Sequence, residues 1–180
     1  MREKLIDYAR NPTPENFSDL REALFAQQEF DPYSSELDKV PELMNAGEFQ
    51  AVVDLVRDNI FPNHFLSPGA HLNVAFACDK LGRSQEAEME QAIAVLLLQG
   101  IAQTGDGSEE KPFKVTRVSD EYDFLFAHQL SMKSQALLER DSRSFDRLTL
   151  ENGDELWFEI TEIQDVLRSK LASASEDQDD

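Results

Sequence analysis

The chain has 180 residues, of which 41% are hydrophobic and 29% are charged. It is long enough for one or two compact domains with a hydrophobic core, and its composition argues against a wholly disordered or fibrous chain. Asp and Glu number 36 against 17 Lys and Arg, so the formal net charge is −19. That charge argues against coating DNA or RNA and against docking on anionic lipid, because both need clustered cations. A basic protein partner, or simply solubility, is the better interpretation.

Localisation is inferred from two further features. Cys78 is the only cysteine, which leaves no internal disulfide and suits a reducing compartment. No apolar run typical of a secretory signal follows the charged start of the chain, and the longest apolar stretch, residues 92–98, is far shorter than the about 20 residues that cross a bilayer. We therefore expect a cytoplasmic protein without membrane contact.

The first hundred residues predict helices. Thr13-Pro14 and Ser67-Pro68 each combine an N-cap hydroxyl with a proline in the first turn. Apolar residues then recur three and four positions apart, as a buried helix face requires. Pro41 either kinks a helix or begins one, and Pro62 is expected to end the helix before it. The expected apolar faces comprise Phe17, Leu20 and Leu24; Phe49, Val52, Val53, Val56 and Ile60; Leu72, Ala75, Phe76 and Leu81; and Met89, Ala92, Ile93, Leu96, Leu97 and Ile101.

These helices are predicted to form a repeat. The segments 46–51 and 81–87 each join two helices through a glycine turn that is followed by an alanine. Gly47 and Gly82 are 35 positions apart, close to the period of about 34 residues in tetratricopeptide repeats (TPRs). Glycine permits the tight turn, and a small alanine lets the second helix pack close to the first. The full TPR consensus of Trp, Tyr and Pro is missing, so we call this region TPR-like.

Glycines in the segment 103–108 interrupt the helical pattern and indicate a domain junction or a long turn. Beyond it, Phe113–Val118 and Gln135–Glu139 predict strands, with a helix between them from about Ser119 to Leu130. The stretches Leu148–Leu150 and Leu156–Ile160 flank a hairpin turn.

The register of this hairpin can be chosen from its hydrophobic pattern. A two-residue turn at Asn152-Gly153 would divide the apolar side chains between both faces. A three-residue loop with Gly153 in the left-handed conformation instead pairs Leu148 with Leu156. That register places Leu148, Leu150, Leu156, Phe158 and Ile160 on one face. We prefer it, because burying one apolar face outweighs the commoner turn type.

Several short motifs spread over residues 17–160 resemble a known family. They are Phe30-Asp31-Pro32-Tyr33, Leu81-Gly82, Glu86-Ala87, Gly105-Asp106-Gly107, Pro112-Phe113-Lys114-Val115 and Val118-Ser119-Asp120-Glu121-Tyr122. In these motifs the chain resembles the uncharacterised bacterial family called domain of unknown function 4919. The run from Gly105 to Tyr122 is the specific part. The resemblance implies a fold and supplies no catalytic residue. Some relatives look exported, and that property is not carried over to this chain.

Candidate metal and nucleophile sites are weak. His71 and Cys78 share a helix face at a spacing compatible with metal ligation, but a zinc site needs three or four ligands. We expect Cys78 to pack as a small hydrophobe and His64 to cap a helix or lie in a loop. Asp106, Ser108, Glu109 and Glu110 offer hard oxygens without the spacing of a calcium loop, which favours a solvated turn.

The cluster Ser119-Asp120-Glu121-Tyr122-Asp123 has two interpretations. Its carboxylates could perform acid–base chemistry or bind a cationic ligand. We prefer the structural interpretation, in which Ser119 is the N-cap of a helix and the acids complement its positive end. The following residues 124–126 are expected to lie in the core. Trp157 is expected to be buried against the terminal helix, with exposure for a partner as the alternative.

We therefore predict an α+β protein with TPR-like antiparallel helical hairpins in residues 1–103 and a small α+β unit in 104–172, containing a short antiparallel sheet. Residues 173–180 are predicted to form a disordered acidic tail. The expected function is a non-enzymatic scaffold that binds a protein or peptide partner. The alternative is an acidic neutraliser or chaperone of a basic protein, of the immunity-protein type. No catalytic residue, cofactor or metal is expected; an enzyme using Asp106 and Asp120 is the least favoured hypothesis.

Overall fold

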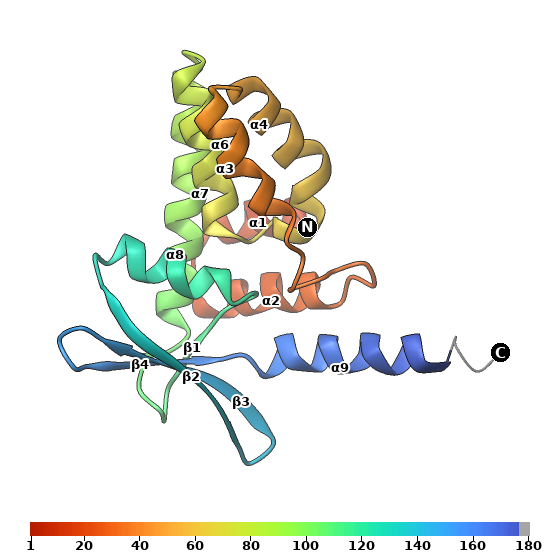
Figure 1. Cartoon of the computed structure of the whole chain (residues 1–180), viewed down its shortest axis with the longest axis vertical. Coiled ribbons are helices and arrows are strands. Elements are labelled where there is room, and N and C mark those ends of the chain that lie inside the picture. The colour runs from red at the N-terminus through yellow and green to blue at the C-terminus, as the bar shows by residue number, and fades with distance from the viewer. Residues whose placement is uncertain (177–180) are drawn as a thin grey trace.

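The computed structural model describes residues 1–176 and shows the predicted α+β class (Figure 1). Two helices, α6 and α7, run side by side through the upper part of the molecule, and a sheet lies below them. Helix α8 crosses between these helices and the sheet, and α9 extends sideways below α2. The helical elements are α1 (Arg2–Arg10), α2 (Pro14–Phe25), η1 (Glu36–Lys39), α3 (Val40–Ala46), α4 (Phe49–Leu55), η2 (Val56–Ile60), α5 (Phe61–His64), α6 (Pro68–Lys80), α7 (Ser84–Gln103), α8 (Ser119–Ala127) and α9 (Thr161–Glu176).

The two predicted glycine turns have the same backbone geometry. Gly47 (φ +75°) follows α3 and Gly82 (φ +73°) follows α6, both in the left-handed conformation that favours glycine. In each turn the next residue donates back to the helix, Glu48 to the Leu43 carbonyl and Arg83 to the Cys78 carbonyl. These bonds end one helix and allow the next to start. The residues from Phe49 to Leu98 contain no strand, as predicted, whereas the TPR-like character of the hairpins stays a prediction.

Pro41 and Pro62 both lie in first turns. Pro41 is at the beginning of α3, directly after the short 3-10 helix η1, so the helix begins there. The prediction that Pro62 ends its helix is wrong. Residues Val56–Ile60 form a π-helix in which the Phe61 N–H reaches the Val56 carbonyl, and α5 then begins with Pro62 in its first turn. The helical stretch is continuous from α4 to α5, and proline, which has no N–H to donate, falls where it changes from π-helix to α-helix.

The buried face of α6 differs from the predicted one. The residues packed against α4 and α7 include Val74, Ala77 and Cys78, while Phe76 is 49% exposed. Nearly every side of α6 is apolar, so periodicity alone does not determine which side faces the core. The small residues face inward because they allow the neighbouring helices to approach closely. Cys78 packs in this core as a small hydrophobe, as predicted.

The sheet has the order β1-β4-β3-β2. Its strands are β1 (Phe113–Lys114), β2 (Met132–Arg140), β3 (Arg143–Leu150) and β4 (Glu155–Glu159). Strands β2, β3 and β4 pair antiparallel as predicted, but β1 is much shorter than expected and pairs parallel with β4. The sheet is therefore mixed rather than wholly antiparallel, because the chain passes through α8 and two strands before it returns beside β1.

The preferred hairpin register is confirmed. Leu148 pairs with Leu156, and Gly153 has φ +90°. Leu148, Leu150, Phe158 and Ile160 are all buried in one core cluster, and Leu156 packs against it. Burial of a single apolar face thus selects the three-residue loop.

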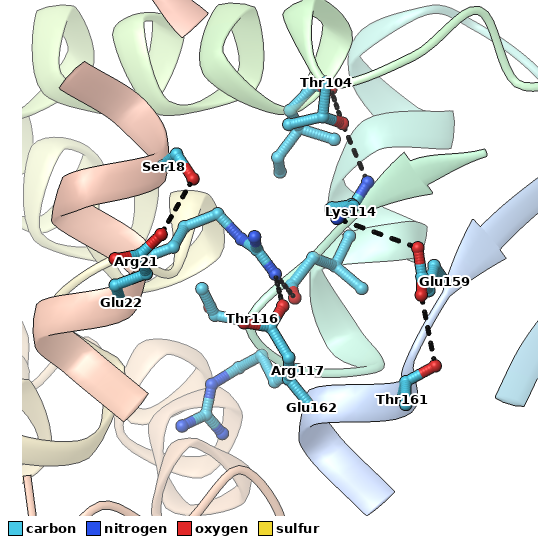
Figure 2. Close-up of polar contacts among 12 residues, drawn as sticks. Ser18, Arg21, Glu22, Thr104, Lys114, Thr116, Arg117, Glu159, Thr161 and Glu162 are labelled. Atoms are coloured by element: carbon cyan, nitrogen blue, oxygen red, sulfur yellow. Dashed lines mark hydrogen bonds and ion pairs between the residues drawn. The ribbon is translucent and has the colours of Figure 1, made fainter. Parts of the chain in front are cut away.

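One core joins the helices to the sheet. Side chains of α1, α2 and α7 share a cluster with those of α8, the sheet and α9. Polar contacts close its edge, as Figure 2 shows: Arg21 of α2 binds Glu162 of α9 at 2.6 Å and the Val115 carbonyl at 3.1 Å. The Lys114 N–H donates to Thr104 Oγ1 at 2.8 Å. The predicted boundary at residue 103 coincides with the end of α7, and the core continues across it.

The two ends of the described chain are helical. Helix α1 lies within the region predicted to be helical, although no separate helix was assigned there. Its Tyr8 is fully buried and donates from its hydroxyl to the Leu96 carbonyl. At the other end α9 continues to Glu176, past residue 173, where the acidic tail was predicted to begin. Residues 177–180, the rest of that prediction, lie outside the described residues. Across residues 1–176, no helix combines the length and the apolar character that spanning a membrane requires.

Candidate functional site

A hollow with two exposed aromatic side chains in its lining lies between α6, α7 and α8, and we call it the α6–α8 trough. Its volume is about 640 Å³, and its lining includes Leu72 and Phe76 of α6 together with Phe126 of α8. Phe126 is 79% exposed and Phe76 is 49% exposed. Large aromatic side chains that remain in water while their neighbours are buried are characteristic of binding surfaces.

Local packing sets the position of both rings. Phe76 meets the ring of Phe49 edge-on, with 6.1 Å between ring centroids, so its outer side remains free to contact a ligand. The Lys80 ammonium lies 5.0 Å from the Phe76 centroid, so this ring already contacts a cation. Phe126 points away from the core because Phe124 and Leu125 occupy the buried side of α8. The prediction that all three residues 124–126 are core is therefore wrong for Phe126.

The charge of the trough is negative. Asp79 and Glu88 are the charged residues in its lining, and no Lys or Arg lines it within the described residues. A second hollow of about 400 Å³ continues along α7 and shares Glu88 and Gln91 with the trough. It adds the exposed Val95 and again no cation from the described chain. Together they form a long surface that combines exposed apolar side chains with the acids Asp79 and Glu88.

A hollow of similar size, about 580 Å³, lies between α1, η2 and α7, and we call it the α1 hollow. Its floor is an ionic network. Arg57 binds Glu86 at 2.8 Å and Glu90 at 3.2 Å, and Glu90 binds His71 Nδ1 at 2.7 Å. The other ring nitrogen of His71 contacts the Phe65 carbonyl at 3.1 Å. Because both ring nitrogens are engaged with acceptors, His71 has no free nitrogen to act as a base or a metal ligand.

The predicted metal candidates do not come together. His71 is engaged as described, Cys78 is buried among apolar side chains, and no three His, Cys, Asp or Glu side chains of the described chain are grouped to hold a metal ion. In the loop after α7, Asp106 Oδ1 accepts from the Ser108 N–H and Ser108 Oγ accepts from the Lys111 N–H. These bonds build a tight exposed turn from the residues considered as calcium ligands.

The other two histidines, His64 and His128, contact only other parts of the fold in the described structure. His64 is buried at the end of α5, and burial, followed by the nearby Arg117 guanidinium, lowers its pKa to about 4. His128 follows α8, donates from Nδ1 to the Phe124 carbonyl at 2.8 Å and stacks on that ring.

Asp120 and Glu121 lie in the first turn of α8, at its positive end, as predicted, and both are buried. Ser119 is not the N-cap; α8 begins at Ser119, and Val118 precedes it without a side-chain bond. Asp120 instead accepts from the Thr116 N–H, the Thr116 hydroxyl and the Arg117 N–H. Burial raises the pKa of Asp120 to about 6, although the Arg117 charge opposes the rise.

The pKa values of two other acids on α8, Asp123 and Glu121, are also raised. Asp123 accepts from the Gly69 N–H at 2.7 Å and so caps α6, the helix that forms one wall of the trough. Burial, with the charge of Asp120, raises the pKa of Asp123 to about 7. Glu121 is fully buried, and burial, then Asp146, raises its pKa to about 9. The least favoured hypothesis paired Asp120 with Asp106, but each makes only local contacts among the described residues.

Trp157 is buried on the outer face of the sheet. Arg140 and Arg147 stack over its ring at 5.3 and 5.9 Å, and Phe145 meets it edge-on. The arginine charges pair with Glu109 and Glu155. The predicted burial is therefore confirmed, and packing against the terminal helix stays a prediction.

The residues that sequence reasoning missed are Phe76 and Phe126, because each was assigned to the core. A usable signal existed for Phe126: Tyr122 and Phe126 are four positions apart and share one face of α8, opposite Phe124 and Leu125. For Phe76 the signal is that Asn73, Asp79 and Lys80, one turn away on the same side of α6, are polar.

No family model matches the chain, and no curated protein or solved structure matches it significantly. The resemblance to domain of unknown function 4919 therefore stays a prediction, and an argument about function rests on the geometry of the chain itself.

Proposed function

We propose that this protein is a non-enzymatic binding module whose α6–α8 trough takes a protein segment with apolar anchors and Lys or Arg side chains. The observation that carries the proposal is the pair of exposed rings, Phe76 and Phe126, in one hollow. The charged residues of its lining are the acids Asp79 and Glu88, and Lys80 stacks on the Phe76 ring.

The chemistry of the trough determines the class of partner. The exposed rings can bury apolar side chains, which is the dominant source of affinity in protein association. Asp79 and Glu88 at the rim attract basic side chains and repel acidic ones. The net charge of −19 acts in the same direction at longer range and speeds the encounter with a basic partner at low salt.

A binding titration tests the proposal. The probe is a short amphipathic leucine–lysine peptide, and its leucine–glutamate counterpart of equal length is the matched ligand control. We expect binding of the lysine peptide only. Phe126→Ala should weaken that binding at least about tenfold, or about 1.4 kcal/mol, as loss of a central aromatic anchor does.

Leu171→Ala is the matched protein control, because Leu171 is an exposed apolar residue on α9, away from the trough. It should leave the affinity unchanged. Equal binding of both peptides, or equal affinities of the Phe126→Ala and Leu171→Ala variants, would contradict the proposal.

The alternative function, neutralisation of a basic protein, is supported by the overall charge. It differs in the source of affinity. A charge-driven neutraliser loses most of its affinity when salt screens the charges, whereas a complex anchored by Phe76 and Phe126 retains its apolar contribution. Affinity measured at low and high salt separates the two functions.

A further inference from the structure

One side of α7 stays exposed over most of the helix. Its residues line the α6–α8 trough at one end and the neighbouring hollow of about 400 Å³ at the other. They recur every three or four positions, from Ser84 through Glu88, Gln91 and Val95 to Gln99, and all five are exposed. Residues at this spacing share one face of a helix. We call this face the α7 stripe; at about 1.5 Å per residue it is about 22 Å long.

The α7 stripe can accept a second helix at close range. Ala87 and Ala92 also belong to it, and their small side chains let another helix come near the α7 backbone. Helix α6 uses the same kind of contact elsewhere in the fold, where Ala77 and Cys78 face the core. Because the stripe is exposed, this packing surface is open in the described chain.

Two apolar points lie along the stripe. At one end, the exposed rings of Phe76 and Phe126 share the trough with Ala87. At the other end, Val95 is 46% exposed in the neighbouring hollow. Ala87 and Val95 are about 12 Å apart along the helix axis, which is close to two turns. A bound helix with two apolar side chains seven positions apart places them at nearly the same interval on one of its faces.

The conformation of the ligand follows from the walls of the two hollows. Within the described chain, every residue that lines them belongs to α6, α7 or α8. Helices bond their own backbone groups, so these walls offer no strand edge to an extended segment. Such a segment would hold its N–H and C=O groups against apolar side chains without partners, which is costly. A helix satisfies those groups internally and presents only side chains to the groove.

Unpaired carboxylates select the charge of that helix. Glu86 and Glu90, on another side of α7, pair with Arg57. Glu88 on the stripe and Asp79 in the trough form no ion pair with a cation of the described chain. A Lys or Arg one turn from an apolar anchor therefore meets a carboxylate that is free to pair with it.

We propose that the ligand of the α6–α8 trough is an amphipathic helix of about four turns that lies along the α7 stripe. One apolar side chain of that helix sits between Phe76 and Phe126, a second sits two turns away on Val95, and a Lys or Arg pairs with Glu88. The inference rests on the proposed function and specifies the conformation and the anchor spacing of the partner.

The test uses the full chain and three peptides of about 15 residues, built from alanine with leucine and lysine. In the one-face peptide, two leucines are seven positions apart and share a helix face. In the two-face peptide, the same residues are rearranged so that the leucines are five positions apart and lie on opposite sides of a helix. The proline peptide is the one-face sequence with a central alanine replaced by proline, which breaks a helix.

Binding and helix formation are measured together by titration followed with circular dichroism. We expect the one-face peptide to gain helix when it binds, and the two other peptides to bind at least about tenfold more weakly. Val95→Ser should weaken binding of the one-face peptide several-fold. Met89→Ser is the matched control, because Met89 is an exposed apolar residue of α7 that lines the α1 hollow instead; it should leave the affinity unchanged.

The outcomes separate this inference from the proposed function. If Phe126→Ala weakens binding of the one-face peptide, but the peptide gains no helix or Val95→Ser acts no differently from Met89→Ser, the helix along α7 is overturned while the trough stands. Equal affinities for the one-face and two-face peptides would overturn the anchor spacing. If no peptide binds the wild-type chain, the proposed function is overturned and the helix inference falls with it.

Discussion

The α1 hollow and the α6–α8 trough are similar in volume and share the helices α6 and α7, yet they differ in how their charges are satisfied. In the α1 hollow, Arg57, His71, Glu86 and Glu90 compensate one another. In the trough, the charged lining residues are the acids Asp79 and Glu88, and the rings of Phe76 and Phe126 stay exposed, with Lys80 stacked on Phe76. The comparison teaches that volume does not distinguish a binding surface from a structural one. Exposed apolar side chains and charges without a bonded partner do distinguish a binding surface, because a ligand can bury the first and pair with the second.

The same contrast distinguishes the two most buried glutamates. Burial alone would raise the pKa of Glu90, but hydrogen bonds from His71 and Arg57 outweigh it and hold that pKa below its ordinary value. Burial of Glu121 is reinforced by Asp146, so its pKa rises to about 9. Glu90 is therefore a charged group that links neighbouring helices through its hydrogen bonds, whereas Glu121 is a buried acid that keeps its proton at neutral pH.

Removing the carboxylate from the α1 hollow should have the largest effect on stability. Glu90→Ala leaves Arg57 and a buried His71 without their shared partner, which costs about 3–5 kcal/mol for a broken buried ion pair. Denaturant titration measures the loss. Glu15→Ala, at an exposed site on α2, is the control and should change stability by less than about 0.5 kcal/mol. Equal losses of stability in the Glu90→Ala and Glu15→Ala variants would contradict the structural role that we assign to the α1 hollow.

The second prediction concerns pH. The folded chain keeps the Glu121 proton up to a pKa of about 9, and the unfolded chain releases it near the ordinary value of a glutamate. Stability from this group is therefore complete at acidic pH and is lost as pH rises toward 9, by up to about 1.4 kcal/mol per unit. Glu121→Gln should flatten that slope between pH 6 and pH 9. A slope unchanged by the substitution would show that Glu121 is ionised in the folded chain.

The turn that connects the two helices of the trough should respond more modestly. Gly82 has φ +73° and open space where a Cβ would stand, so Gly82→Ala meets no neighbour and costs only the left-handed backbone strain, about 1 kcal/mol. Gly47→Ala, with φ +75° and the same open space, is the matched change and should cost the same. Thermal unfolding of both variants checks whether the two losses of stability are equal. A much larger loss of stability at one glycine would show that its turn is packed differently from the other.

The smallest effect is predicted for the ring that we assign to a ligand. Phe126→Ala should change stability by less than about 0.5 kcal/mol, because Phe126 is 79% exposed. Phe124→Ala, two positions earlier in the core of α8, should cost about 3–5 kcal/mol. Comparable losses for the two variants would mean that Phe126 is a core residue and that the trough has lost its main anchor.

The sequence determined those features that depend on local chemistry and on one buried face. Capping by Thr13 and Ser67, the left-handed Gly47 and Gly82 turns and the Leu148–Leu156 register all follow from short-range rules. The exposed rings could be predicted only in part in this way, because α6 and α8 carry apolar residues on more than one side. The closeness of Glu121 to Asp146 could not be predicted, because it joins a helix to a strand 25 positions away.

The most direct test of the account maps where a ligand binds. Amide NMR of the chain, titrated with the leucine–lysine peptide, reports on both hollows in one experiment. The account predicts shifts along α6 near Phe76 and along α8 at Phe126, with resonances around Arg57 and Glu90 unmoved. Shifts concentrated at the α1 hollow, or spread evenly over the acidic surface, would contradict the assignment of the trough as the binding site.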